Sequence, residues 1–203
     1  MLSLENAYSN EEALEWEGRL RRALQLEPDL PLTYVAELKI DGLSISLIYE
    51  DGALRQALTR GDGRIGEDVT SNIRALDTLP RSLQSAPGRI EVRGEIFFPL
   101  PEFRRLNDRR RETGEDPFAN PRNAAAGSIR LLDPAQTAER RLGAFLYQIA
   151  GAREANLRSH WETLERLRGW GFPVNPHARL CRGLDEALAA ASEAGPRRPG
   201  GAP

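Results

Sequence analysis

A hairpin signal at Asp51-Gly52 constrains the fold more than any other feature of this sequence. The dipeptide separates two strand-like runs, 43–50 and 53–60. Asp-Gly is favoured in two-residue turns because both central positions require a positive φ. With another strand-like run at 34–40 just before it, the pattern predicts an antiparallel meander.

The rest of the chain lacks the regular strand–helix–strand repeat of a doubly wound sheet. Further strands are expected at 89–98 and 142–151, and helices at 10–26, 67–76, 101–113, 159–170 and 184–194. Asn120 followed by Pro121 fits the cap and first position of another helix. The predicted fold class is therefore α+β, with mostly antiparallel sheets and flanking helices.

Length and composition indicate one globular domain over 1–194, followed by a disordered Pro/Gly/Arg tail at 195–203. The sequence has neither a membrane-spanning apolar run nor a signal-peptide pattern, so we expect a cytoplasmic protein without a membrane partner. One cysteine and two histidines exclude an internal disulfide and argue against a zinc site, so no metal ligands are predicted. The net charge of −2 predicts no global attraction to nucleic acid.

Lys39 is the only lysine among 28 basic residues; the other 27 are arginines. A lysine amine can lose its proton and act as a nucleophile, whereas an arginine guanidinium cannot. The strong preference for arginine is equally compatible with a lysine kept for its function and with a lysine that remains by chance. If 34–41 is one strand, Glu37, Lys39 and Asp41 share a face, which is either an exposed charge ladder or the floor of a pocket.

The run 89–98 repeats this design, because Glu91, Arg93 and Glu95 alternate with apolar residues. Gly94 among them permits a close backbone approach. Residues 61–66 match G-x-G-x-x-G, but the strand before them belongs to a hairpin, which favours a glycine-rich turn over a dinucleotide site.

Small residues fill the segment between Arg122 and Arg130. A helix through both arginines would place them roughly on one face, eight residues apart. Such a helix suits either a phosphate backbone or tight packing in the core.

Lys39-Ile40-Asp41-Gly42 matches the Lys-x-Asp-Gly attachment motif of covalent nucleotidyltransferases. The surrounding blocks make the match more specific, because their order resembles that of NAD-dependent bacterial DNA ligases. The blocks are 1–8, 37–42, 59–63 with 66–70, 92–95 and 120–130. The resemblance implies a nucleotidyltransferase adenylation domain, ATP-grasp-like in fold.

The resemblance also implies roles for matching positions. Lys39 would form the lysyl–AMP bond and Asp41 would orient the reacting groups. The remaining nucleotide contacts would come from Ser3 and Leu4 at the adenine pocket, Glu37 at the adenine amino group, and Arg60 with Glu95 at the ribose. Arg122 and Arg130 would contact DNA and phosphate.

The implied reaction transfers AMP from NAD to Lys39, then to a DNA 5′-phosphate, before a 3′-hydroxyl seals the nick during replication and repair. Glu37 and Asp41 would favour the charged lysine, and a bound Mg²⁺ would offset them. The expected partners are NAD and nicked duplex DNA, and the expected state is a monomer.

Several parts of the family pattern do not occur here, including the later Asp-Gly-Val-Val-like and lysine-bearing motifs and the N-terminal helical segment. We therefore expect an adenylation domain truncated at both ends, incomplete in its sheet and marginally stable. Two alternatives stay open: a non-catalytic nucleotide- or DNA-binding remnant, and an ATP-dependent nucleotidyltransferase.

Overall fold

The computed structural model describes residues 6–27, 29–61, 63, 65–84, 88–150 and 157–194. The chain divides into two compact units. The larger unit includes Lys39–Pro176, and the smaller unit joins Met1–Leu38 to His177–Pro196. Both units combine helices with antiparallel strands, which confirms the α+β prediction. The predicted tail at 195–203 lies outside the described residues.

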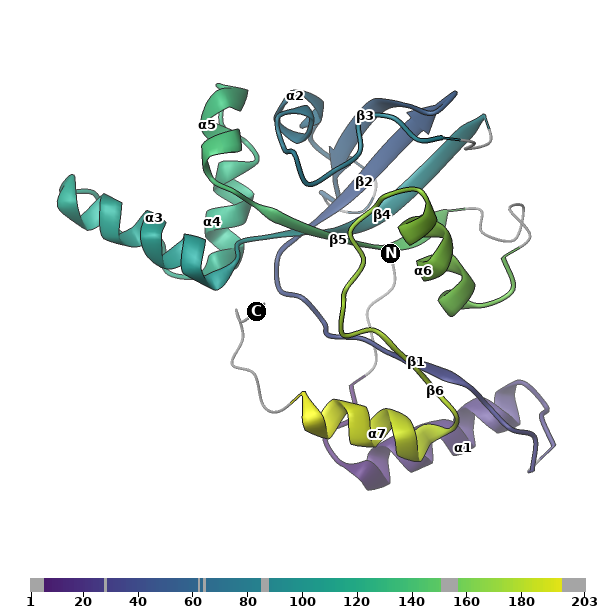
Figure 1. The fold of residues 1–203 in the computed structure, drawn as a ribbon. Coiled ribbons are helices and arrows are strands. Elements are labelled where there is room, and N and C mark those ends of the chain that lie inside the picture. The colour runs from purple at the N-terminus through teal and green to yellow at the C-terminus, as the bar shows by residue number, and fades with distance from the viewer. Residues whose placement is uncertain are drawn as a thin grey trace. The chain divides into compact units, whose positions relative to one another are not determined.

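A four-stranded sheet forms the centre of the larger unit (Figure 1). Its order is β3-β2-β4-β5, and every neighbouring pair is antiparallel. The strands are β2 (Leu43–Glu50), β3 (Ala53–Thr59), β4 (Arg89–Phe97) and β5 (Gly143–Ala150). All four match the predicted strands to within one residue at each end.

The Asp51-Gly52 turn joins β2 to β3 as the sequence predicts. Asp51 has φ 49° and Gly52 has φ 78°, so both occupy the left-handed region that this hairpin turn requires. A Cβ on Gly52 would lie 2.5 Å from the carbonyl oxygen of Leu83. The glycine is therefore required by both its backbone angle and the chain that passes over it.

Alternation along the strands gives the sheet one apolar and one polar face. The apolar face carries side chains that are at most 2% exposed, namely Ile45, Leu47, Val92, Ile96 and Leu146. Ser44, Ser46, Glu91, Arg93 and Glu95 occupy the alternate positions. The predicted polar row on 89–98 is therefore confirmed, and it lies against the serines of β2.

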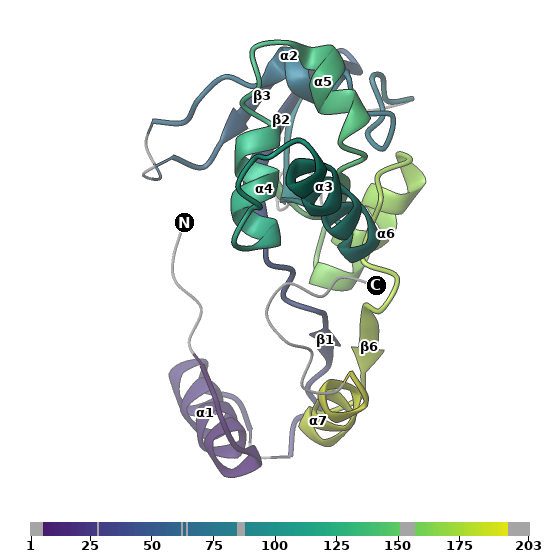
Figure 2. The same cartoon turned by 90° about the vertical axis from the view of Figure 1, so that its left-hand side faces the viewer.

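Five helices accompany this sheet: α2 (Thr70–Arg74), α3 (Leu100–Glu112), α4 (Pro121–Ser128), α5 (Pro134–Glu139) and α6 (His160–Gly169). In Figure 2, α4 runs beside α3, and it also contacts β2 and β4. α2 is shorter than the helix predicted at 67–76. Residues 67–69 instead form hydrogen bonds with β3, as a neighbouring strand would. The sequence analysis missed α5, although Asp133 caps it and Pro134 is its first residue.

The smaller unit contains α1 (Asn10–Ala23), β1 (Tyr34–Ala36), β6 (Arg179–Cys181) and α7 (Leu184–Glu193). β1 pairs antiparallel with β6, and α7 packs on both strands. α1 ends at Ala23 rather than at the predicted residue 26, because Gln25 adopts a left-handed φ of 52°. The sequence analysis missed β6, which has only three residues and no alternating pattern.

Candidate functional site

Lys39 lies in the segment that connects β1 to β2, and its side chain is exposed. The prediction that 34–40 forms one strand is wrong, because β1 pairs with β6 only through Ala36. Glu37, Lys39 and Asp41 therefore do not form a row on a strand. The attachment motif is instead a loop that leads directly into the central sheet.

Gly42 holds this loop against β4. A Cβ at Gly42 would lie 2.2 Å from the carbonyl oxygen of Ile96 and 3.0 Å from Cγ of Glu95. Real side chains do not tolerate such distances to backbone, so only glycine allows the approach. The same glycine is also among the groups that lower the pKa of Glu95. The spacing Lys-x-Asp-Gly thus places Lys39 and Asp41 just outside a buried acid.

Glu95 is that acid, and it is only 8% exposed on β4. Its Oε2 accepts a hydrogen bond of 2.9 Å from the hydroxyl of Ser44, its cross-strand neighbour. Burial raises the pKa of Glu95, while Ser44, the Arg122 charge, Gly42 and the Lys39 charge oppose that rise. Glu95 is therefore a desolvated carboxyl group surrounded by groups that stabilise its charged form.

Asp41 and Arg122 form an ion pair of 2.9 Å between the loop and α4. Asn120 caps α4 by accepting a hydrogen bond of 2.8 Å from the N–H of Asn123, and Pro121 is the first helical residue. Both predicted features of this helix start are confirmed, and they place Arg122 in the first turn. The structure thus brings together four of the predicted site residues, namely Lys39, Asp41, Glu95 and Arg122.

Arg60 and Tyr147 extend this site across the sheet. The N–H of Arg60 donates to the carbonyl oxygen of Ser44 at 3.2 Å, directly after β3 ends. The pKa of Tyr147 is raised by burial and by the Glu95 charge, and lowered by Ser44, Arg60 and Arg93. Tyr147 is therefore a site residue that the sequence analysis missed. Its position in the predicted strand 142–151 could have indicated this role. Tyr147 lies two residues after Phe145, which is the register partner of Glu95.

Arg130 does not share a helical face with Arg122, so that prediction is wrong. α4 ends at Ser128 with Ile129 as its cap, and Arg130 follows in the turn beyond it. Arg130 pairs with Glu67 at 2.5 Å. The two arginines are consequently held by different carboxylates, Asp41 and Glu67.

The remaining residues predicted to bind the nucleotide are not part of this group. Glu37 is half-buried and belongs to the smaller unit. Ser3 and Leu4 lie outside the described residues. Their predicted contacts with adenine stay predictions.

The glycine-rich segment begins with a turn, in which the N–H of Gly63 donates to the carbonyl oxygen of Arg60 at 2.9 Å. A Cβ on Gly61 would lie within 2 Å of the carbonyl oxygen of Ile65, and one on Gly66 would meet the carbonyl oxygen of Thr59. The strand before the turn, β3, is antiparallel to β2. This geometry favours the turn interpretation over a dinucleotide-binding loop.

The described residues contain no group of three or more His, Cys, Asp or Glu side chains that could hold a metal ion. Asp41 and Glu95 are the two carboxylates beside Lys39, and each already has a partner. Mg²⁺ usually keeps several waters and binds one or two carboxylates together with substrate phosphates. The donor set therefore fits a phosphate-bound Mg²⁺ rather than a metal held by protein alone.

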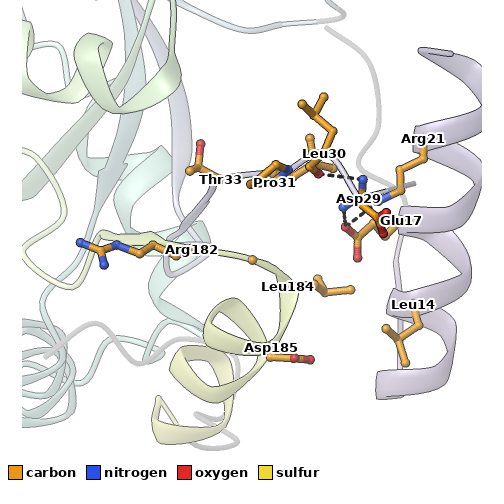
Figure 3. A pocket seen from close by; sticks show the side chains of 12 residues that line it. Leu14, Glu17, Arg21, Asp29, Leu30, Pro31, Thr33, Arg182, Leu184 and Asp185 are labelled. Atoms are coloured by element: carbon orange, nitrogen blue, oxygen red, sulfur yellow. Dashed lines mark hydrogen bonds and ion pairs between the residues drawn. The ribbon is translucent and has the colours of Figure 1, made fainter. Parts of the chain in front are cut away.

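A cavity of about 590 Å³ lies in the smaller unit, between α1, the loop before β1 and the start of α7 (Figure 3). Arg21 lines this cavity and donates hydrogen bonds to Glu17 at 2.8 Å and to the carbonyl oxygen of Leu30 at 2.9 Å. None of the predicted site residues lines this cavity. Two of its charged lining residues, Glu17 and Arg21, pair with each other, and Arg21 also binds the loop before β1. These contacts give the cavity a structural character.

Comparison with known proteins bears on the whole chain. A family model described as the NAD-dependent DNA ligase adenylation domain matches residues 1–200. A protein named DNA ligase from Thermotoga maritima is 50% identical over 188 residues, which cover 93% of this chain and 27% of that protein. DNA ligases from Rhodospirillum rubrum and Paramagnetospirillum magneticum are 49% and 50% identical, covering 94% and 98% of this chain. The chain spans 27–29% of the length of these three relatives.

No helix within the described part of the chain is long and apolar enough to cross a membrane.

Proposed function

Since the chain belongs to the NAD-dependent DNA ligase adenylation domain family, we propose that it catalyses nucleotidyl transfer from NAD to Lys39. The amine of Lys39, once it has lost a proton, attacks the phosphorus of the AMP moiety. A nitrogen–phosphorus bond forms, the bond to the phosphate of nicotinamide mononucleotide breaks, and the mononucleotide leaves. The product is AMP attached covalently to Lys39.

The side chains around Lys39 suit the parts of this nucleotide. Glu95 would accept hydrogen bonds from the ribose hydroxyls through a carboxylate already fixed by Ser44. Arg60, beyond β3, would contact the same sugar. Asp41 would orient the amine, and its partner Arg122 would contact phosphate. Glu37, Ser3 and Leu4 would bind the adenine base.

The second half of the proposed activity uses nicked duplex DNA. AMP passes from Lys39 to the 5′-phosphate, and the 3′-hydroxyl then displaces AMP as the nick is sealed in replication or repair. Arg122 and Arg130 would contact the DNA phosphates, because one guanidinium group can donate two parallel hydrogen bonds to a phosphate. We further propose that the chain acts as a cytoplasmic monomer.

Mg²⁺ is the proposed metal of this reaction. Bound to the nucleotide phosphates, it would draw negative charge from the reacting phosphorus and favour the neutral lysine amine. Asp41, which is more exposed than Glu95, is the protein carboxylate that could help to hold it. The protein's own contribution is to exclude water from Glu95, to fix the loop at Gly42 and to present the amine of Lys39.

One observation carries the proposal: the sole lysine of the chain is exposed beside a buried acid, in a loop held by an arginine–carboxylate pair. Because Lys39 is the only lysine, the experiment has a simple readout. The intact mass of the chain is measured after incubation with NAD and Mg²⁺. We expect a gain equal to one AMP, which acid removes, since phosphorus–nitrogen bonds are acid-labile.

The matched control is Lys39→Arg, which keeps the positive charge but offers no nucleophile. It should fold like the wild-type chain and gain no mass. A gain in this variant would place the adduct on another residue and overturn the proposal. An adduct that forms only with ATP would overturn the choice of NAD. NAD binding without any adduct would favour a non-catalytic binding module.

A further inference from the structure

The polar face of the sheet contains two serine–glutamate hydrogen bonds of similar geometry. Ser44 donates to Glu95 at 2.9 Å, and Ser46 donates to Glu91 at 2.7 Å. Both bonds link β2 to β4, only two residues apart along β2. The chemistry of the two pairs is the same, but their surroundings differ.

Glu91 has a guanidinium partner, because Arg93 pairs with its Oε1 at 2.7 Å. The pKa of Glu91 is lowered: burial raises it, but the hydrogen bonds from Arg93 and Ser46 prevail. Glu95 is more deeply buried and forms no ion pair among the described residues. Within the described part of the chain, Ser44 is consequently the one side chain that hydrogen-bonds to the Glu95 carboxylate.

We propose that Ser44 is a positioning residue, whose hydroxyl fixes one oxygen of the Glu95 carboxylate so that the other faces the nucleotide ribose beside Lys39. The inference rests on the proposed nucleotidyl-transfer function. Ser44 touches neither the reacting atoms nor the nucleotide. It acts through Glu95 in two ways, by restricting rotation of the carboxyl group and by stabilising its ionised form.

Three features of the structure support this role. Ser44 and Glu95 are directly opposed in the β2–β4 register, so the strands themselves set the distance. Gly42, two residues before Ser44, packs against the Glu95 side chain, because a Cβ there would lie 3.0 Å from Cγ of Glu95 and would strike the backbone of β4. Tyr147 on β5 is electrostatically coupled to the same pair, since burial and the Glu95 charge raise its pKa while Ser44 lowers it.

The first test follows the carboxyl carbon of Glu95 by NMR in the nucleotide-free chain, with the signal assigned from its loss in Glu95→Gln. Ser44→Ala should move the titration midpoint to higher pH, by about one pH unit for a hydrogen bond to a charged group. Ser44→Thr, which keeps a hydroxyl, should restore the wild-type midpoint. Ser46→Ala is the matched control and should leave the Glu95 midpoint unchanged.

The second test measures NAD affinity by calorimetry between pH 5 and pH 8. An ionised Glu95 accepts stronger hydrogen bonds from ribose, so affinity should fall as the pH drops through its midpoint. In Ser44→Ala this fall should begin at higher pH, and affinity within that interval should be about tenfold weaker than in the wild type. In Ser44→Ala/Glu95→Gln, loss of the serine should have no further effect beyond that of Glu95→Gln.

The outcomes separate the positioning role from the proposed function. If the wild type binds NAD but Ser44→Ala shows neither a shifted midpoint nor a shifted pH profile, the positioning role is overturned. If affinity falls equally at every pH and Thr does not rescue it, Ser44 matters only to the packing of the sheet, which also overturns the role. Failure of the wild type to bind NAD at any pH would count against the proposed function and the inference together.

Discussion

At the scale of single residues, Gly42 determines whether the attachment loop can lie against the sheet. Gly42→Ala places a methyl group 2.2 Å from the backbone oxygen of Ile96, so the loop or β4 must shift. We expect a loss of about 1–3 kcal/mol in the free energy of unfolding, the usual range for overpacking. AMP transfer to Lys39 should fall by more than this loss of stability explains, because the loop that carries the amine is displaced. Urea unfolding and the intact-mass assay measure the two effects.

The control for this prediction is Gly169→Ala at the end of α6. A Cβ there meets nothing within 4 Å, and alanine is the better helix former by up to about 1 kcal/mol. Gly169→Ala should therefore be neutral or slightly stabilising and should leave AMP transfer intact. Equal behaviour of the two variants would show that close packing at Gly42 does not matter.

Glu95 makes a residue-scale prediction about pH. Burial raises its folded-state pKa above the ordinary value of 4.5, so the folded chain binds this proton more tightly than the unfolded chain. Stability from this group is greatest below pH 4.5 and declines as the pH rises to the folded pKa. The difference in unfolding free energy between the wild type and Glu95→Gln should therefore fall as the pH rises across that interval. Above the interval this difference should stay constant. Urea unfolding of both proteins from pH 4 to pH 8 tests this, and a wild type that gains relative stability over the interval contradicts it.

At the scale of elements, α4 links its own stability to the position of Arg122. Asn120 accepts a hydrogen bond of 2.8 Å from the first turn, and Ser159 caps α6 in the same way at 3.1 Å. Replacing either cap by alanine should cost about 1 kcal/mol of unfolding free energy. Only Asn120→Ala should also reduce AMP transfer, because α4 presents Arg122 to Asp41. If Ser159→Ala reduced transfer equally, the effect would come from stability alone.

The elements also differ in how far the sequence could predict them. The four strands of the sheet were predictable, because period-two alternation and the Asp51-Gly52 turn are local signals. The end of β1 was not, because pairing with β6 depends on residues more than 140 positions away. Arg130 was misplaced for a related reason: a small-residue run continues past Ser128, but the helix stops there and Arg130 turns to Glu67. The proximity of Lys39, Asp41, Glu95 and Arg122 followed only from the family resemblance, since no single local pattern spans them.

At the scale of the whole molecule, the two units bury very different amounts of apolar surface. The larger unit contains side chains such as Leu47, Val92, Ile96 and Leu146, none of them exposed. In the smaller unit, the buried apolar residues among those described are Ala13, Ala178 and Cys181, which are all small. Since the hydrophobic contribution follows the buried apolar area, the smaller unit should open at a lower free energy.

Amide hydrogen exchange of the whole chain tests this difference in local stability. Amides of β1 and β6 should exchange at least about a hundredfold faster than those at the centre of β2 and β4, which corresponds to about 2.7 kcal/mol in opening free energy. The register pairs Val35–Leu180 and Leu47–Val92 are matched places to compare, because each lies inside an antiparallel ladder. Equal protection at both positions would mean that the two units unfold together. Selective protection of β1 and β6 on adding NAD would instead tie the smaller unit to the nucleotide, as expected if Glu37, one residue after β1 ends, binds the adenine base.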